Sequence, residues 1–307
     1  MLDALVQDTR YALRWLVRSP GFAIVAILSL GIGIGCNTAI FAVVDALLLR
    51  PLPVREPSRL VDIYTSGADG DTYSTNSLPD ILDYREQRGV FADIVGYSPM
   101  FAGVSRGDRA RLVLGEVVTG NYFTTLGVSA RLGRTLVAAD DAPDAPRTVV
   151  LSNRYWRREF GGEPSAVGRT LRIRGQEFTV VGVLDDAFTG MVPMLAPEIW
   201  VPVRFAEEVE PAGINEIVPS PTGSSRIDRR GQRWLFVKAR LAGDSSVEEA
   251  RAAVDVVSAR LRAEHPQTNK DRRVTVRPTA DTRLHPEADK MLAWVVTGTM
   301  LAVGLVL

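Results

Sequence analysis

The chain has 307 residues, a single cysteine and a formal net charge of zero, with 36 basic and 36 acidic side chains. This length accommodates one or two globular units together with membrane segments. The balanced charge gives no basic field of the kind that binds nucleic acid, and one cysteine excludes an intrachain disulfide. His265 and His285 each precede a proline and lack metal-ligand spacing, so no metal site is predicted.

Residues 2–18 have an amphipathic pattern. Leucines and valines recur at intervals of three and four, whereas Arg10, Arg14 and Arg18 fall on the other side. Such a helix lies in a membrane interface with its arginines near the headgroups, or packs on protein like any amphipathic helix. Because an apolar run follows at once, we expect the interfacial arrangement over residues 1–19.

The apolar run at residues 22–49 is the main feature of the sequence. No charged residue occurs between Arg18 and Asp45, and a helix needs about 20 residues to cross a bilayer. We therefore predict a transmembrane helix over residues 20–49. A cleaved signal peptide ending near Cys36 is the first alternative, but the run continues too far beyond that residue. A dinucleotide-binding glycine loop is the second, and it would need a preceding strand.

Small and polar residues interrupt this run at Gly31, Gly33, Gly35 and Asn37. Gly31 and Gly35 are four residues apart and share a helix face. Small residues at that spacing let another helix approach closely, although glycine is also simply common in membrane helices. We predict that these four residues form a helix-packing face.

Orientation does not follow from charge, because three arginines precede the run and three follow it closely. Residues 50–289 have the pattern of a soluble domain, beginning at the prolines that follow Arg50. A two-residue hairpin turn is predicted around Gly175-Gln176, and residues 207–232 read as a long exposed loop. The remaining predicted elements are strands at 60–64, 94–104, 111–118, 148–151, 170–174, 177–184 and 198–203, and helices at 78–88, 121–126 and 153–160.

The end of the soluble region has a regular order of elements. A strand at 234–241 is followed by a capping-box pattern at Ser245 and Glu248, a helix to Glu264 and a strand at 273–277. Strand, helix and strand in this length indicate a βαβ unit with a right-handed crossover. Residues 60–104 have the same order. The fold class predicted is α+β: two βαβ units in one sheet, with a mostly β subdomain inserted at about residues 115–230.

Residues 290–307 are apolar to the last position, apart from Lys290. At 1.5 Å per residue the segment falls just short of a full crossing. We predict a second transmembrane helix here, so that two membrane helices flank the soluble domain. The apolar run has no polar exit, and the sequence is therefore expected to be a fragment of a longer membrane protein.

The sequence contains no recognisable catalytic motif. Residues 162–170 read GEPSAVGRT, but a phosphate-binding loop has four residues between its glycines and then a lysine. Here there are five residues and an arginine, and a strand rather than a helix is predicted to follow. The carboxylates lie scattered without the spacing of an acid/base pair. We predict no enzyme activity and no cofactor bound by this chain.

Several segments together resemble MacB/FtsX-like ABC transporter permeases, in particular the duplicated type of soil bacteria. They are LSLGIGIGCNTAIFAVVDALLLRPLPV, NYFTTLGVSARLGRTL, VVLSNRYWRREFGGEPSAVGRTLRIRGQEFTVVGVL and WLFVKARL. The resemblance implies that residues 1–19 are cytoplasmic and that residues 50–289 form an extracytoplasmic MacB-like periplasmic core domain. It further implies a multi-pass protein of the bacterial inner membrane, whose ATP is bound by a separate ATPase subunit.

Three functions follow as hypotheses. The first is a permease subunit that couples its ATPase partner to the extracytoplasmic domain, for efflux or mechanotransmission, together with other permease helices or a second permease half. The second is a membrane-anchored binding or scaffold module without transport. The third, an enzyme in the external domain, lacks any constellation of residues to support it.

Overall fold

The computed structural model of the chain describes residues 7, 11, 14, 15, 17–44, 52–66, 72–106, 109–192, 195–210, 225–282 and 285–306. Internal contacts divide the chain into two units, Met1–Arg50 with Glu287–Leu307 and Pro51–Pro286. Most of the predicted helix at 2–18 and residues 211–224 of the predicted loop at 207–232 lie outside the described residues. The start of that predicted loop belongs instead to a short helix, Ala206–Val209.

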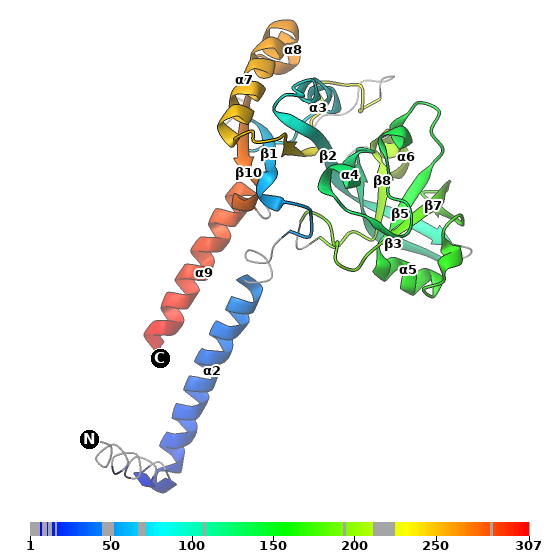
Figure 1. Ribbon diagram of the computed structural model, residues 1–307. Helices are drawn as coiled ribbons and strands as arrows, with labels where there is room; N and C mark the ends of the chain where they lie inside the picture. Colours follow the sequence, from blue (N-terminus) through cyan, green and yellow to red (C-terminus); the bar gives the residue numbers. More distant parts are fainter. Residues whose placement is uncertain are drawn as a thin grey trace. The chain divides into compact units, whose positions relative to one another are not determined.

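The first unit contains α2 (Pro20–Val44) and most of α9 (Pro286–Val306), which Figure 1 draws as two long helices. In the described part of the chain, one helix is long and apolar enough to cross a bilayer, at Pro20–Ala39. Only 6% of that window is buried. A core helix of a soluble domain would bury most of its apolar side chains, so these side chains have the environment expected of a helix in lipid.

The second unit is built on one ten-stranded sheet. Its strands are β1 (Leu60–Ser66), β2 (Phe91–Arg106), β3 (Arg109–Val118), β4 (Ala130–Gly133), β5 (Thr148–Leu151), β6 (Thr170–Ile173), β7 (Gln176–Leu184), β8 (Ile199–Pro202), β9 (Phe236–Leu241) and β10 (Arg273–Pro278). Its helices are α3 (Leu78–Arg85), α4 (Tyr122–Leu126), α5 (Asn153–Phe160), α6 (Ala206–Val209), α7 (Val247–Glu264) and α8 (Pro266–Asn269).

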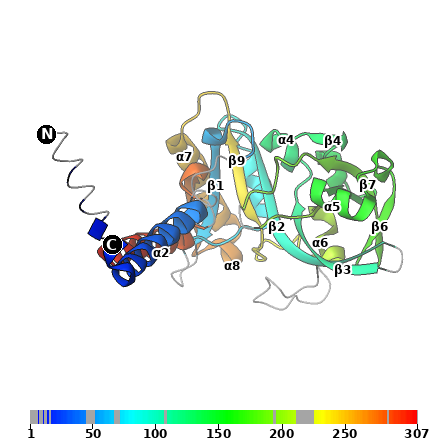
Figure 2. The same ribbon diagram turned by 90° about the horizontal axis from the view of Figure 1, so that it is seen from below.

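Two interleaved βαβ units form one end of the sheet, in the order β10-β1-β9-β2. Since β9 pairs antiparallel with both β1 and β2, the strands β1 and β2 run parallel with β9 between them. Likewise β9 and β10 flank β1. Figure 2 shows β1, β9 and β2 side by side. The α+β class with βαβ units is confirmed. Each unit, however, takes in a strand of the other, an arrangement that local sequence order does not predict.

The long hairpin of β2 and β3 carries the sheet into the inserted segment. From β2 the pairing runs through β3, β8, β5, β7 and β6, and β6 then pairs with β2 again. These six strands therefore form a closed ring. Closure leaves no free edges along the ring, which protects the strands from pairing with other chains.

Turn residues explain where several elements end. Ser152 accepts a hydrogen bond from the Tyr155 amide at the start of α5, and Gly161 ends that helix with φ 65°. The hairpin between β6 and β7 turns one residue earlier than predicted. Its two turn residues are Arg174 and Gly175, at φ 50° and 83°, and Gln176 already belongs to β7. Two successive positive φ values match the twist of a hairpin.

The capping box of α7 is also displaced by one residue from its predicted position. The Ser246 hydroxyl accepts from the Glu249 amide at 3.1 Å, and Glu249 Oε2 accepts from the Ser246 amide at 2.7 Å. The prediction of Ser245 and Glu248 was wrong because both pairs, 245/248 and 246/249, have the required spacing. The tertiary position of the helix selects the second pair.

The two serines allow a matched test. Ser246→Ala removes the side-chain cap and should lower the free energy of unfolding by about 1 kcal/mol. Ser245→Ala should change it by less than about 0.5 kcal/mol, as surface substitutions usually do. Urea denaturation of the detergent-solubilised chain, followed by circular dichroism, measures both. Equal effects would contradict this assignment of the cap.

Candidate functional site at the two ends of the core domain

Both connections to the helices of the first unit leave the core domain at one corner of the sheet. The segment that follows α2 enters β1 at Leu60, and the segment that leads to α9 starts where β10 ends at Pro278. Because β1 and β10 are antiparallel neighbours, with Val61 opposite Pro278, these two chain ends lie side by side. A displacement of either connection therefore acts on the same pair of strands.

A buried arginine fixes the first connection. Arg240 of β9 is only 5% exposed. Its Nε donates to the Thr125 carbonyl at 2.6 Å and its Nη2 to the Arg55 carbonyl at 2.6 Å, with longer bonds to Glu56 and Leu126. Thr125 and Leu126 end α4. One guanidinium thus joins the chain that leaves α2, the strand β9 and the helix α4.

The charge of Arg240 is compensated mainly by these carbonyl dipoles. Burial lowers the pKa of Arg240, and the nearby arginines Arg55 and Arg59 lower it further. The nearest paired carboxylate, that of Glu56, lies 3.9 Å away and is 56% exposed. A guanidinium offers five donors in a fixed plane and stays charged in proteins, so it can hold several carbonyls where a lysine could not.

Backbone contacts complete this attachment. The Arg55 amide donates to the Leu126 carbonyl at 3.0 Å. Gly127 lies against Arg55 with φ 73°, and a Cβ at Gly127 would come within 2.6 Å of the Arg55 Cβ. The Arg59 side chain donates to the carbonyls of Leu241, the last residue of β9, and of Gly243. We call residues 52–59, Arg240 and the end of α4 at 125–127 the linker clamp.

A buried charge pair lies directly beside the clamp. Lys238 Nζ and Asp62 Oδ1 are 2.5 Å apart, and both side chains are 5% exposed. The two residues face each other across β9 and β1 in the strand register. Removing one partner of such a pair leaves the other charge buried without compensation, which lowers the free energy of unfolding by several kcal/mol. The pair therefore fixes the register of the strand that the linker enters.

The second connection is held by aromatic contacts. The His285 Nε2 is 2.9 Å from the Tyr73 carbonyl, and the rings of Tyr64, Tyr73 and His285 lie edge to face at 5.4 to 6.1 Å. Arg277 of β10 donates to the Tyr73 hydroxyl at 3.1 Å. Because Tyr64 belongs to β1, the second connection contacts the strand that the first connection enters.

The predicted packing residues lie on α2. Nothing lies within 4 Å of a Cβ placed on Gly31 or Gly35, whereas Gly33 is buried and Asn37 half-buried. The Asn37 Oδ1 has no hydrogen-bond partner within the described ranges. Thr38 donates to the Ile34 carbonyl of its own helix at 2.8 Å. The packing face thus stays a prediction, with an open strip at Gly31 and Gly35.

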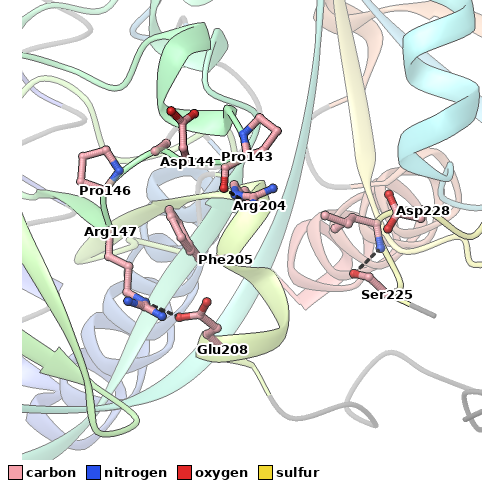
Figure 3. A pocket seen from close by; sticks show the side chains of 11 residues that line it. Pro143, Asp144, Pro146, Arg147, Arg204, Phe205, Glu208, Ser225 and Asp228 are labelled. Atoms are coloured by element: carbon pink, nitrogen blue, oxygen red, sulfur yellow. Dashed lines mark hydrogen bonds and ion pairs between the residues drawn. The ribbon is translucent and has the colours of Figure 1, made fainter. Parts of the chain in front are cut away.

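A cavity of about 540 Å³ lies on the inserted part, between residues 143–147, 204–208 and 225–228. Its arginines are already engaged: Arg147 pairs with Glu208 at 2.5 Å, and Arg204 donates to the Pro143 carbonyl (Figure 3). No group of three or more potential metal ligands occurs among the described residues. The arginines that line this cavity therefore already have partners, and we take the linker clamp as the candidate functional site.

Sequence reasoning predicted the strand at 234–241 but missed the role of its charges. Lys238 and Arg240 are two residues apart, so both side chains point to one face of a strand that is otherwise apolar. Two cations on one face of a buried strand require partners. Asp62, an acidic residue inside the apolar run LVDIY, could have been recognised from the sequence as a partner for one of these cations.

The family follows from comparison of the sequence with family models. The model of the MacB-like periplasmic core domain matches residues 23–257, which is more than half of the chain. The chain belongs to this family. It is accordingly an ABC transporter permease chain, anchored in the membrane and carrying an extracytoplasmic domain of the MacB type.

Solved structures support the same fold. The periplasmic region of MacB from Actinobacillus actinomycetemcomitans superposes with a TM-score of 0.50 at 15% identity, covering 74% of this chain and 91% of that one. A permease domain from Porphyromonas gingivalis gives a TM-score of 0.52 at 17% identity, covering 73% and 91%. At these identities the likeness shows the fold alone. No curated protein sequence matches the chain.

The clamp can be tested by Arg240→Met, which keeps most of the apolar volume but leaves buried carbonyls unpaired. We expect a loss of about 3 kcal/mol in the free energy of unfolding. Arg172→Met, which removes an exposed ion pair with Glu177, should cost less than about 0.5 kcal/mol. Urea denaturation measures both, and a loss below 1 kcal/mol for Arg240→Met would contradict the clamp.

The glycine strip can be tested in the membrane helix. Gly31→Ile with Gly35→Ile should weaken helix association, because the β-branched side chains prevent close approach of a second backbone. Val25→Ile, at an exposed position of α2 that shares no face with the four predicted packing residues, serves as control. Crosslinking of the protein in native membranes measures association. Unchanged crosslinking in the double variant would show that these glycines are not a contact surface.

Proposed function

We propose that the chain is the membrane subunit of an ABC-type efflux or mechanotransmission system. In this proposal a separate ATPase binds ATP on the cytoplasmic side, where residues 1–19 also lie. Residues 20–49 and 290–307 cross the membrane, and residues 50–289 respond outside the cell membrane. Other permease helices or a second permease half complete the membrane part. The chain itself performs no catalysis.

The observation that carries this proposal is the common attachment of both connections. The segment after α2 and the segment before α9 reach one end of the β1–β10 pair. The linker clamp then ties the first segment to α4, and hence to the closed ring of strands. A rigid joint of this kind transmits a shift of a helix to the domain, whereas a flexible tether would absorb it.

A membrane-anchored scaffold would need only a tether. The buried clamp, with an almost fully buried arginine bonded to four carbonyls, therefore favours the coupling function over the scaffold. Figure 2 labels β9 and α4, two of the elements that the clamp joins within the core domain.

The native Cys36 provides the experiment, because it is the sole cysteine and lies exposed on α2. A second cysteine is introduced by Val256→Cys, an exposed position of α7. Spin labels at both sites, in the complete permease reconstituted with its ATPase, report distances by pulsed electron resonance. We expect the distance distribution to change when ATP is added, and to stay unchanged with an ATPase unable to bind nucleotide.

Identical distributions in all nucleotide states, with an ATPase that binds and hydrolyses ATP, would contradict the coupling function and favour the scaffold. A matched pair of labels at Leu112→Cys and Val256→Cys, with Cys36→Ser, reports changes inside the core domain alone. It separates a movement relative to the membrane helix from a deformation of the domain.

A further inference from the structure

Glu116 is a buried carboxyl group near the end of β3 and is 0% exposed. Its Oε2 accepts from Trp200 Nε1 of β8 at 2.7 Å and from the Tyr122 hydroxyl of α4 at 3.3 Å. Its Oε1 is buried without a hydrogen-bond partner among the described residues. None of the ion pairs found in that part of the chain includes Glu116. A buried carboxylate without a cation is costly to ionise.

The surroundings of Glu116 are aromatic and largely apolar. Phe123 and Phe188 pack against the ring of Trp200, each with a centroid distance of 5.9 Å. The titratable neighbours are Tyr97 of β2 and Tyr122 of α4, whose own pKa values burial raises well above the usual range. Asp62 of β1, which pairs with Lys238 of β9, raises the pKa of Tyr97 further.

Burial raises the pKa of Glu116 from 4.5 to about 7, and the bonds from Trp200 and Tyr122 oppose part of this rise. A carboxyl group with a raised pKa in the folded state binds a proton that the unfolded state has already released. Its stabilising contribution is therefore complete below about pH 4.5 and is lost as the pH rises through 7.

The short helix α4 connects this group to the linker clamp. Tyr122 begins α4 and donates to Glu116, whereas Thr125 and Leu126 at its end accept from Arg240 and the Arg55 amide. Five residues are thus held at one end by a carboxyl group and at the other by a guanidinium. A change that weakens the contact between Glu116 and Tyr122 therefore also loosens the helix to which Arg240 is bonded.

We propose that Glu116 is a proton-operated latch for α4. In its neutral form the carboxyl group lets α4 close over the aromatic cluster of Tyr97, Tyr122, Phe123, Phe188 and Trp200. Ionisation places an uncompensated charge in this cluster and loosens α4, and with it the grip on residues 52–59. The inference goes beyond the coupling function and holds whether or not the chain takes part in transport.

Amide hydrogen exchange of the intact chain in detergent tests the latch. Rates at residues 122–126 are compared at pH 6 and pH 8, each divided by the intrinsic rate at that pH. A group with a pKa of about 7 in the closed form and about 4.5 in the open form makes opening roughly tenfold more frequent at pH 8. Amides of β10 serve as the internal reference and should stay unchanged.

Glu116→Gln should abolish the pH dependence at residues 122–126. Glu177→Gln, at an exposed position of β7, should leave it intact. A flat profile in the unmodified chain, or the same tenfold change in Glu116→Gln, would overturn the proposal.

A second variant keeps the test open if Glu116→Gln does not fold. Trp200→Phe removes one donor to the carboxylate and should move the midpoint of the pH dependence upward by at least half a pH unit. An unmoved midpoint would also overturn the proposal, because the donor would then have no influence on the titrating group.

Discussion

The buried guanidinium of Arg240 is the interaction on which the arrangement of the core domain depends. Desolvating a positive charge costs several kcal/mol, and this cost is offset here by carbonyl oxygens of two separate segments. Those segments are the chain that leaves α2 and the end of α4. Because the compensation requires both segments in place, the arginine ties the linker position to the position of a helix on the sheet.

The closed ring of strands gives the clamp a stiff support. The ring shares β2 with the βαβ part of the sheet, and β2 pairs with β9, the strand that carries Arg240. Among the residues that the structure describes, the buried apolar side chains form two clusters. The second cluster begins at Leu52, close after α2 in the chain, and reaches Trp200 in the ring. Apolar packing and the buried charge therefore join the same two regions.

Much of the fold was predictable because local patterns set it. The limits of α5 follow from Ser152 and Gly161, and the strands at 60–64 and 148–151 follow from short apolar runs. The interleaving of the two βαβ units was not predictable, since strand order depends on contacts between residues far apart in sequence. The position of the capping box was predicted wrongly for a related reason. The pairs 245/248 and 246/249 have the same spacing, and the packing of α7 selects the second pair.

The candidate site was less predictable than the fold. The apolar helix and the family resemblance come from contiguous residues, and the family is confirmed. The linker clamp instead joins residues 52–59, 125–127 and 240 through backbone carbonyls, which have no sequence signature. The charges of Lys238 and Arg240 within an apolar strand indicate that partners exist, but they do not name them. The role of Gly31, Gly33, Gly35 and Asn37 stays a prediction.

Amide hydrogen exchange at Arg55 in the intact, membrane-reconstituted chain tests most directly whether the linker is rigidly held. Its amide donates to the Leu126 carbonyl within the clamp. If residues 52–59 are a rigid joint, this amide will be protected at pH 6 to the same degree as the amides of β9. Exchange at the rate of an unstructured peptide would show that the linker is a loose tether and would contradict the account.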